Sequence, residues 1–260
     1  MLSKDGFGMC DHYLIMSSSY TDGVRVALDV TDSDLICEEH ISGLIAEIKK
    51  QCGEDIPLSS HLIQTESSSW DSVVHYDPFF SSVYVASSLF DFIAKVRESR
   101  ILTGIDVAHY ILSKIPCTYL SLEKLVYFSY ADYLCGHMKC LFDDRIFAFT
   151  HGPVVQSVYE AYKRSGYRHV NRYDDGDDGK ISTTVREMPA ASRILFAEDG
   201  VDKICSIDDT IRKYDRLSSS ELVSLTHRAG SPWSNVDSTL PYQVISDELI
   251  LEHHHVDSIE

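Results

Sequence analysis

The sequence predicts an α+β fold in which a mainly helical C-terminal domain, residues 101–260, follows a small N-terminal α+β unit, residues 1–100. Two observations lead to this prediction. Runs with the period of two that is typical of strands occur mostly before residue 90, whereas apolar residues recur at helical spacing through much of the chain after residue 103. A chain of 260 residues is also long enough for two modest domains that each bury a core.

In the N-terminal unit, the pattern first predicts a β-hairpin. Residues 12–18 and 24–30 have the composition of two short strands, and the Thr-Asp-Gly sequence that precedes the second is typical of a turn. An amphipathic helix is expected over residues 35–51, because its apolar residues share one face and a glycine follows soon after.

Two further strands and a second helix complete the expected N-terminal unit. The strands are predicted over residues 71–76 and 82–87, and the helix over residues 89–97. The strands of this unit would form one antiparallel sheet covered by the first helix. The boundary to the C-terminal domain is placed near residues 98–102.

The C-terminal domain is expected to begin with two helices. Thr103 and Asp106 have the spacing of a capping box, ahead of a helix that Pro116 ends. Ser121 is predicted to cap the second helix and Gly136 to end it. This second helix is apolar nearly all round, which places it in the middle of the domain.

A strand over residues 142–150 with both faces covered follows. Gly152 and Pro153 are predicted to open the next helix, because proline in the first turn loses no useful donor, and Gly166 to end it. The buried stripe of that helix is predicted to consist of Val155, Val158, Tyr159 and Tyr162.

Three more helices are expected towards the C-terminus. One covers residues 199–214, a second has a capping box formed by Ser218 and Glu221, and the last begins at Ser246. The polar segment 171–180 is interpreted as a solvated loop, because its fit to a calcium-binding loop fails at two ligand positions.

The composition limits the classes of partner. The chain carries 40 acidic and 23 basic residues, a net charge of −17. Such a chain repels phosphate backbones, which disfavours nucleic acid, whereas a basic protein partner is compatible with it. The sequence contains no apolar run as long as a signal peptide or membrane span, and its seven cysteines follow no disulfide pattern. A cytoplasmic protein with free thiols is therefore expected.

Two short motifs have the side chains of catalytic or metal sites. Ser121 and Lys124 match the S-x-x-K motif of acylating serine enzymes, but the companion motifs are missing, so capping explains the serine and solvation the lysine. Cys135, His137 and Cys140 are side chains that zinc selects.

A zinc site at these residues would need a fourth ligand, for which His151 is a candidate. Packing as free thiols is the favoured interpretation, since cysteine packs well as a small apolar residue. A metal- or thiol-dependent hydrolase is the alternative from a different functional class. We expect no catalytic residue, metal or cofactor.

Several side chains are candidates for binding a partner protein, because tyrosine buries a large area at low entropic cost. The polar end of the helix before Gly166 is expected to be exposed. His227 and Trp233 form a possible recognition pocket. The favoured interpretation is structural: Thr226 bonds back into its helix, His227 lies at the helix C-terminus and Trp233 fills the core. The candidates are Tyr159, Tyr162, Lys163, Arg164, Tyr167, His227 and Trp233.

Five pieces of the sequence occur in a recognisable order between about residues 103 and 252. They are IDVAHYIL, LSLEKLVYFSYADYL, LFDDRIFAFTHGPVV, ELVSLTHRAGSPW and ISDELI. Together they resemble the Panacea domain, the SocA-like antitoxin family of bacteria and phages. Within the fourth piece, Thr226-His227 and Pro232-Trp233 match the TH and PW positions of the family.

The resemblance implies a non-catalytic antitoxin that neutralises a cognate protein toxin by direct binding, with the toxin encoded by an adjacent gene. The SocA type within the family is an adaptor that hands its toxin to a protease, so proteolytic delivery is the nearest alternative. The resemblance does not cover residues 1–100, and it leaves their role and the oligomeric state open.

Overall fold

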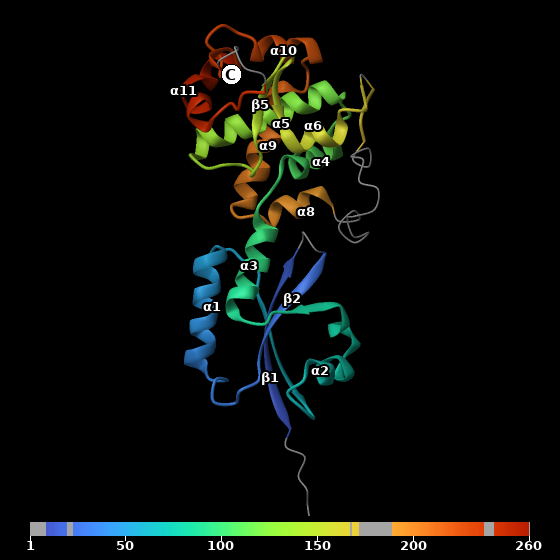
Figure 1. The fold of residues 1–260 in the computed structure, drawn as a ribbon, viewed down its shortest axis with the longest axis vertical. Coiled ribbons are helices and arrows are strands. Elements are labelled where there is room, and N and C mark those ends of the chain that lie inside the picture. Colours follow the sequence, from blue (N-terminus) through green and yellow to red (C-terminus); the bar gives the residue numbers. More distant parts are fainter. Residues whose placement is uncertain (1–8, 20–22, 167, 172–188, 237–241, 260) are drawn as a thin grey trace, which may run out of the picture. The chain divides into compact units, whose positions relative to one another are not determined.

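A computed structural model describes residues 9–19, 23–166, 168–171, 189–236 and 242–259 (Figure 1). These residues form two compact units, one ending at Arg100 and the other beginning at Ile101. The predicted α+β class is confirmed, because a small sheet lies in the N-terminal unit and helices dominate the C-terminal one. The predicted hairpin turn and most of the polar loop lie outside the described residues.

The N-terminal sheet has the strand order β3-β1-β2-β4. Strands β1 (Cys10–Ser19) and β2 (Val24–Val30) form the predicted antiparallel hairpin, and β3 (Ser59–Thr65) pairs with the other edge of β1. Strand β4 (Val83–Val85) runs parallel to β2. The prediction of a wholly antiparallel sheet is therefore wrong, because the chain crosses over between β2 and β4 instead of turning back as a hairpin.

Helices cover both faces of this sheet. Helices α1 (Glu38–Cys52) and α3 (Leu89–Arg100) pack on one face, and α2 (Trp70–Tyr76) with the short 3₁₀ helix η1 (Pro78–Ser82) packs on the other. The prediction of a strand over residues 71–76 is wrong. A run of six residues is too short to separate a period of 2 from one of 3.6, and only Val73 of this run is buried.

Helix α1 offers a test of local helix stability. Gly43 lies exposed in its middle, and a Cβ at this position would have no neighbour within 4 Å. Replacing Gly43 with alanine is expected to stabilise the N-terminal unit by about 0.5–1 kcal/mol, because glycine loses more backbone entropy in a helix. Urea unfolding followed by circular dichroism measures this change. An unchanged or lowered midpoint would contradict the expectation.

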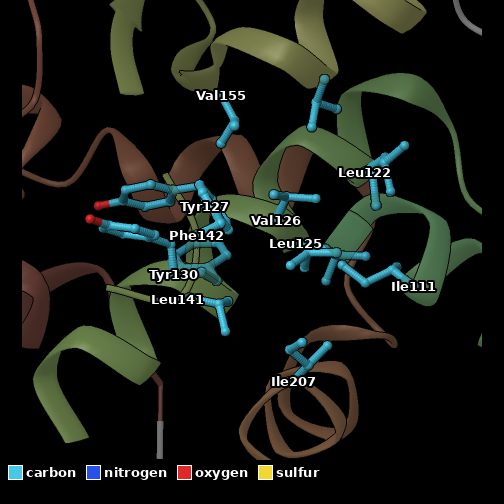
Figure 2. Packing of buried hydrophobic residues seen from close by; sticks show 14 of the residues in the cluster. Ile111, Leu122, Leu125, Val126, Tyr127, Tyr130, Leu141, Phe142, Val155 and Ile207 are labelled. Carbon is cyan, nitrogen blue, oxygen red and sulfur yellow. The ribbon is translucent and has the colours of Figure 1, made fainter. Parts of the chain in front are cut away.

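Helix α5 (Tyr119–His137) is the centre of the C-terminal unit (Figure 1). It is buried on nearly all sides, as predicted, and apolar side chains from its neighbours pack against it (Figure 2). No helix among the described residues is long and apolar enough to cross a membrane. The surrounding elements are α4 (Gly104–Lys114), α6 (Gln156–Tyr162), α8 (Ala190–Leu195), α9 (Gly200–Tyr214), α10 (Ser219–Thr226), η2 (Trp233–Asn235) and α11 (Asp247–Asp257).

The helix ends follow the predicted chemistry in most cases. The capping boxes that begin at Thr103 and Ser218 are both present, and Ser246 caps α11. The prediction for α5 is wrong at both ends. Thr118 is its N-cap and accepts a hydrogen bond from the backbone of Ser121, and the helix continues past Gly136 to a left-handed residue, Met138.

A two-stranded hairpin lies beside α5. Strand β5 (Ile146–Phe149) pairs antiparallel with β6 (Gly152–Val155). The prediction that Gly152 and Pro153 open a helix is therefore wrong. Both residues are extended and pair with β5, and α6 begins only at Gln156.

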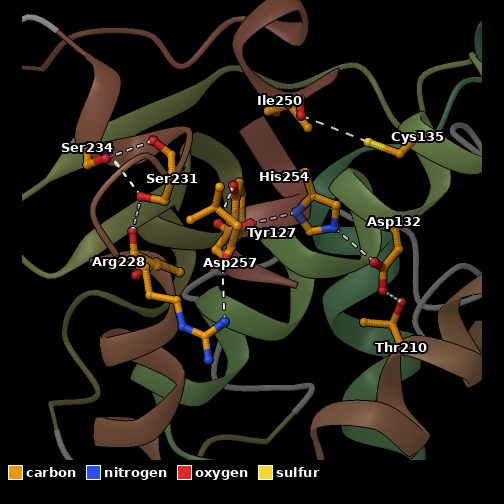
Figure 3. Close-up of polar contacts among 12 residues, drawn as sticks. Tyr127, Asp132, Cys135, Thr210, Arg228, Ser231, Ser234, Ile250, His254 and Asp257 are labelled. Carbon is orange, nitrogen blue, oxygen red and sulfur yellow. Dashed lines mark hydrogen bonds and ion pairs between the residues drawn. The ribbon is translucent and has the colours of Figure 1, made fainter. Parts of the chain in front are cut away.

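A buried polar cluster joins three helices of the C-terminal unit (Figure 3). His254 of α11 contacts Asp257 Oδ1 through Nδ1 at 2.8 Å and Asp132 Oδ1 of α5 through Nε2 at 2.9 Å. Thr210 of α9 donates to Asp132 Oδ2 at 2.9 Å, and Tyr127 donates to Asp257 Oδ2 at 3.0 Å. Each buried polar group thus has a partner, and the cluster fixes α11 and α9 against α5.

This cluster makes stability depend on pH. Burial alone would lower the pKa of His254, but its two carboxylate partners outweigh burial and raise the pKa from 6.5 to about 9. Because the folded-state pKa is the higher one, the stabilisation is complete below pH 6.5 and is lost as the pH rises through 9.

We expect the free energy of unfolding of the C-terminal unit to fall by on the order of 3 kcal/mol as the pH rises through this window. Denaturant titrations of the wild type and of His254→Gln at several pH values measure it. The pH dependence of the difference between the two proteins isolates the histidine, and a constant difference would contradict the expectation.

Candidate partner-binding surface

A groove of about 200 Å³ opens where the β5–β6 hairpin meets α6. Four aromatic rings and Val154 form its apolar part. The ring centroid of Phe149 lies 5.0 Å from that of Tyr159 and 5.1 Å from that of Tyr242, and both pairs have the favoured edge-to-face geometry. The residues that line this β5–α6 groove are Phe147, Phe149, Val154, Gln156, Tyr159, Glu160, Lys163 and Tyr242.

Local periodicity explains how these side chains meet. Phe147 and Phe149 are two residues apart on a strand and therefore share one side of β5. Tyr159 and Lys163 are four residues apart at the end of α6, so they lie on one side of the helix. The Lys163 ammonium lies 5.4 Å from the centroid of the Tyr159 ring, which is a cation–π geometry.

The C-terminal end of α6 continues into a basic segment. Residues 163–172, KRSGYRHVNR, contain four lysine or arginine residues and no acidic residue, in a chain whose net charge is −17. Arg164 and Arg168 line a second, polar hollow of about 360 Å³ together with Ser165, His169 and Asn171. Lys163 thus lines the β5–α6 groove, while Arg164 and Arg168, which follow it in the sequence, line the polar hollow.

His227 and Trp233 hold the hairpin that forms one wall of the groove. The indole Nε1 of Trp233 donates to the carbonyl oxygen of Phe149 at 2.8 Å, and Nε2 of His227 lies 3.2 Å from the carbonyl oxygen of Thr150. The two rings pack on each other with centroids 3.9 Å apart. These side chains therefore position the end of β5.

Helix α5 holds the second strand of the same hairpin through two buried charged side chains. Glu123 accepts a hydrogen bond from the backbone N–H of Val155 at 3.0 Å, and Lys124 donates to the carbonyl oxygen of Pro153 at 2.5 Å. Burial raises the pKa of Glu123 and lowers that of Lys124, because it disfavours the charged form of each. The two opposite charges compensate each other next to β6.

The structure separates the predicted partner-binding candidates. Tyr159 and Lys163 line the β5–α6 groove, and Arg164 lines the neighbouring hollow. Tyr162 was expected both in the buried stripe of its helix and among the exposed candidates. The first expectation is confirmed and the second is wrong, because its side chain points into the core and is fully buried. Tyr167 lies outside the described residues.

The structural interpretation of the Thr-His pair is confirmed. Thr226 is buried and donates back to the carbonyl oxygen of Val223 at 2.8 Å, and His227 is the C-cap of α10. Trp233 is half-buried and packs against the main core. The sequence pattern did not indicate that His227 and Trp233 also contact β5.

The short catalytic motif is explained differently from the prediction. Ser121 contacts Ser219 through their hydroxyl groups at 2.7 Å, whereas the ammonium of Lys124 contacts Pro153. Lys124 is fully buried, so the expectation that it is solvated is wrong.

The predicted free thiols are consistent with the structure, in which Cys135 and Cys140 are unpaired and exposed. Within the described ranges, no group of three histidine, cysteine or acidic residues is arranged to hold a metal ion.

Sequence reasoning missed Phe147, Phe149 and Tyr242 as surface residues. The alternation in residues 146–149 does place the two phenylalanines on one side, but it does not show that this side is only partly covered. Tyr242 lies 93 residues beyond Phe149 in the sequence, and only the tertiary fold brings their rings together.

Comparisons with known proteins bear on this region of the chain. Residues 122–234 match the family described as "Antitoxin SocA-like, Panacea domain". Antitoxin SocA of Caulobacter vibrioides (strain NA1000 / CB15N) is 27% identical over 133 residues, which is 49% of this chain and 66% of that relative. The match thus spans just under two thirds of the relative's length.

No solved structure matches the chain. The matched residues include the β5–β6 hairpin, α6, His227 and Trp233. They cover less than the 103–252 range of the resemblance, but its three central pieces are included except for Leu120 and Ser121. Over residues 122–234 the chain is therefore similar to the SocA-like Panacea domain family.

Proposed function

We propose that this protein is an antitoxin that neutralises a cognate protein toxin by direct, non-catalytic binding. The observation that carries the proposal is the match of residues 122–234 to the SocA-like antitoxin family. The similarity to a relative named as an antitoxin supports the same function. The exposed aromatic groove beside a basic segment is consistent with it, since aromatic and cationic side chains supply most of the binding energy of protein interfaces.

The product of the adjacent gene is the proposed toxin, and a growth assay tests the proposal. Expression of that product alone should arrest growth, and co-expression with this protein should restore it. The two proteins should also copurify. Continued arrest while both proteins are produced at comparable levels would refute the antitoxin function.

The half-life of the toxin separates the two modes of neutralisation. Direct occlusion predicts that growth recovers while toxin turnover stays the same. Delivery to a protease predicts that the toxin is degraded faster when this protein is present. A chase after translation is stopped, with and without the antitoxin, measures the difference.

A further inference from the structure

We propose that the β5–α6 groove and the basic end of α6 form one docking surface for the toxin, and that this surface takes a toxin segment in which an apolar side chain is flanked by carboxylates. The inference rests on the proposed antitoxin function and specifies its surface and the chemistry of its partner. Three features support it: the size and apolar lining of the groove, the charged side chains near it, and the contacts that hold the hairpin in place.

The size and chemistry of the groove fit a side chain rather than a cofactor. Its volume of about 200 Å³ lies below the range of roughly 300–1,000 Å³ that is usual for small-molecule sites. Tyr242, which lines the groove, is exposed to 67% of its full accessibility, and Val244, which forms a β-bridge with the lining residue Phe147, to 47%. Exposed apolar side chains that surround a hollow mark an interaction site.

Local charge selects the partner. The groove contains one anion, Glu160, which accepts a hydrogen bond from Gln156 at 3.1 Å, and one exposed cation, Lys163. Arg164 and Arg168 follow within five residues, and residues 163–172 include no acid. Electrostatic complementarity then favours carboxylates on the docked segment.

This conclusion differs from the one that net charge alone suggests. An overall charge of −17 predicts a basic partner, because distant charges steer the encounter. Salt screens the interaction between charges that are more than about 8–10 Å apart. Once the two proteins are in contact, the charged side chains around the groove therefore determine the electrostatic fit. A toxin with an acidic, apolar segment on an otherwise basic surface satisfies both conditions.

The surface is also better suited to a protein segment than to nucleic acid. Base stacking needs free ring faces, but the Lys163 ammonium lies over one face of the Tyr159 ring, 5.4 Å from its centroid. The strong acidity of the whole chain opposes contact with a phosphate backbone. Nucleic acid is therefore an outcome that the experiment has to exclude.

The hairpin wall of the groove is held in place before any partner binds. Trp233 and His227 contact the β5 end of the hairpin, and Glu123 and Lys124 of α5 contact the other strand, β6. A rigid wall reduces the entropy that is lost on binding. These four side chains act through the hairpin, so they are positioning residues rather than contact residues.

Two variants and a matched control test the surface with the full-length chain and the adjacent-gene product as the probe. Tyr242→Ala removes the most exposed ring, and Lys163→Glu with Arg164→Glu reverses the local charge. Both should weaken binding roughly tenfold, the second through slower association and mainly at low salt. Arg212→Glu with Arg216→Glu is the control, because it makes the same charge change on two exposed residues, one in the last turn of α9 and one just beyond its end.

The results separate failure of the surface from failure of the function. If the wild type restores growth and binds the toxin while both variants and the control bind equally well, the proposed surface is wrong and the antitoxin function stands. If the wild type neither binds nor restores growth, the proposed function itself fails. Circular dichroism of each variant confirms that it is folded.

Photocrosslinking tests the chemistry of the partner segment. A benzophenone amino acid at position 242 should crosslink to a toxin peptide that carries aspartate or glutamate beside an apolar residue, and mass spectrometry identifies that peptide. The same probe at position 212 should not yield it. Crosslinking to a peptide of net positive charge, to nucleic acid, or to nothing while the complex is intact would overturn the proposal.

Discussion

Replacing Asp257 with alanine is expected to lower the free energy of unfolding of the C-terminal unit by about 3–5 kcal/mol. The carboxylate is fully buried and accepts from both His254 and Tyr127. Its loss leaves the Tyr127 hydroxyl without its acceptor and His254 with only one carboxylate. In a unit of this size the melting temperature should fall by about 10 °C, which differential scanning calorimetry measures.

Asp209→Ala is the matched control for this change. Asp209 is also an aspartate in an ion pair, with Arg212, but both side chains are largely exposed. Exposed pairs of this kind contribute less than about 1 kcal/mol, so the melting temperature should hardly move. Equal effects of the two substitutions would show that the buried cluster does not hold α11 on the domain.

Replacing Gly152 with alanine is expected to lower the free energy of unfolding by about 3 kcal/mol and, under the proposed function, to abolish binding of the proposed toxin. Gly152 has a φ of +95°, which a residue with a Cβ adopts only under strain. A Cβ would also lie 2.5 Å from the hydroxyl oxygen of Thr226, which is buried and has little room to move. The hairpin should shift, and the wall of the β5–α6 groove with it.

Two further variants separate strain from collision. Gly166 has a left-handed φ of +60°, but a Cβ at this position would meet no atom within 4 Å. Gly166→Ala should therefore introduce backbone strain alone and lower the free energy of unfolding by about 1 kcal/mol. The double variant Gly152→Ala with Thr226→Ala should lose less free energy of unfolding than the sum of the losses in the two single variants, because the collision is removed. Additive costs in urea titrations would rule out the contact with Thr226 as the cause.

Much of the fold could be predicted because local patterns determine it. The α5 helix, the first hairpin and three helix caps follow from periodicity and from single hydroxyl or carboxylate side chains. The failures fall on short segments. Residues 59–65 become a strand through pairing with β1, which lies before β2 and α1 in the chain. Gly152 and Pro153 instead pair with β5 directly before them, because proline fits an edge strand as well as the first turn of a helix.

The candidate surface was predictable only in part. Tyr159 and Lys163 follow from helical spacing within one segment. Phe149 and Tyr242 meet only through tertiary structure, and the exposure of Tyr162 was misjudged because its position near a helix end did not show that the core continues beneath it.

Side chains of α5 bond to residues of α11, which is much later in the chain, and this affects how the protein folds during synthesis. The central helix appears early, but Asp132 and Tyr127 find their partners only when α11 has been made. On the ribosome, the N-terminal unit contains all its strands within its own first hundred residues and can form during synthesis. The C-terminal unit has to wait for its last helix, so an incompletely translated chain would lack the buried polar cluster that fixes α11 and α9 against α5.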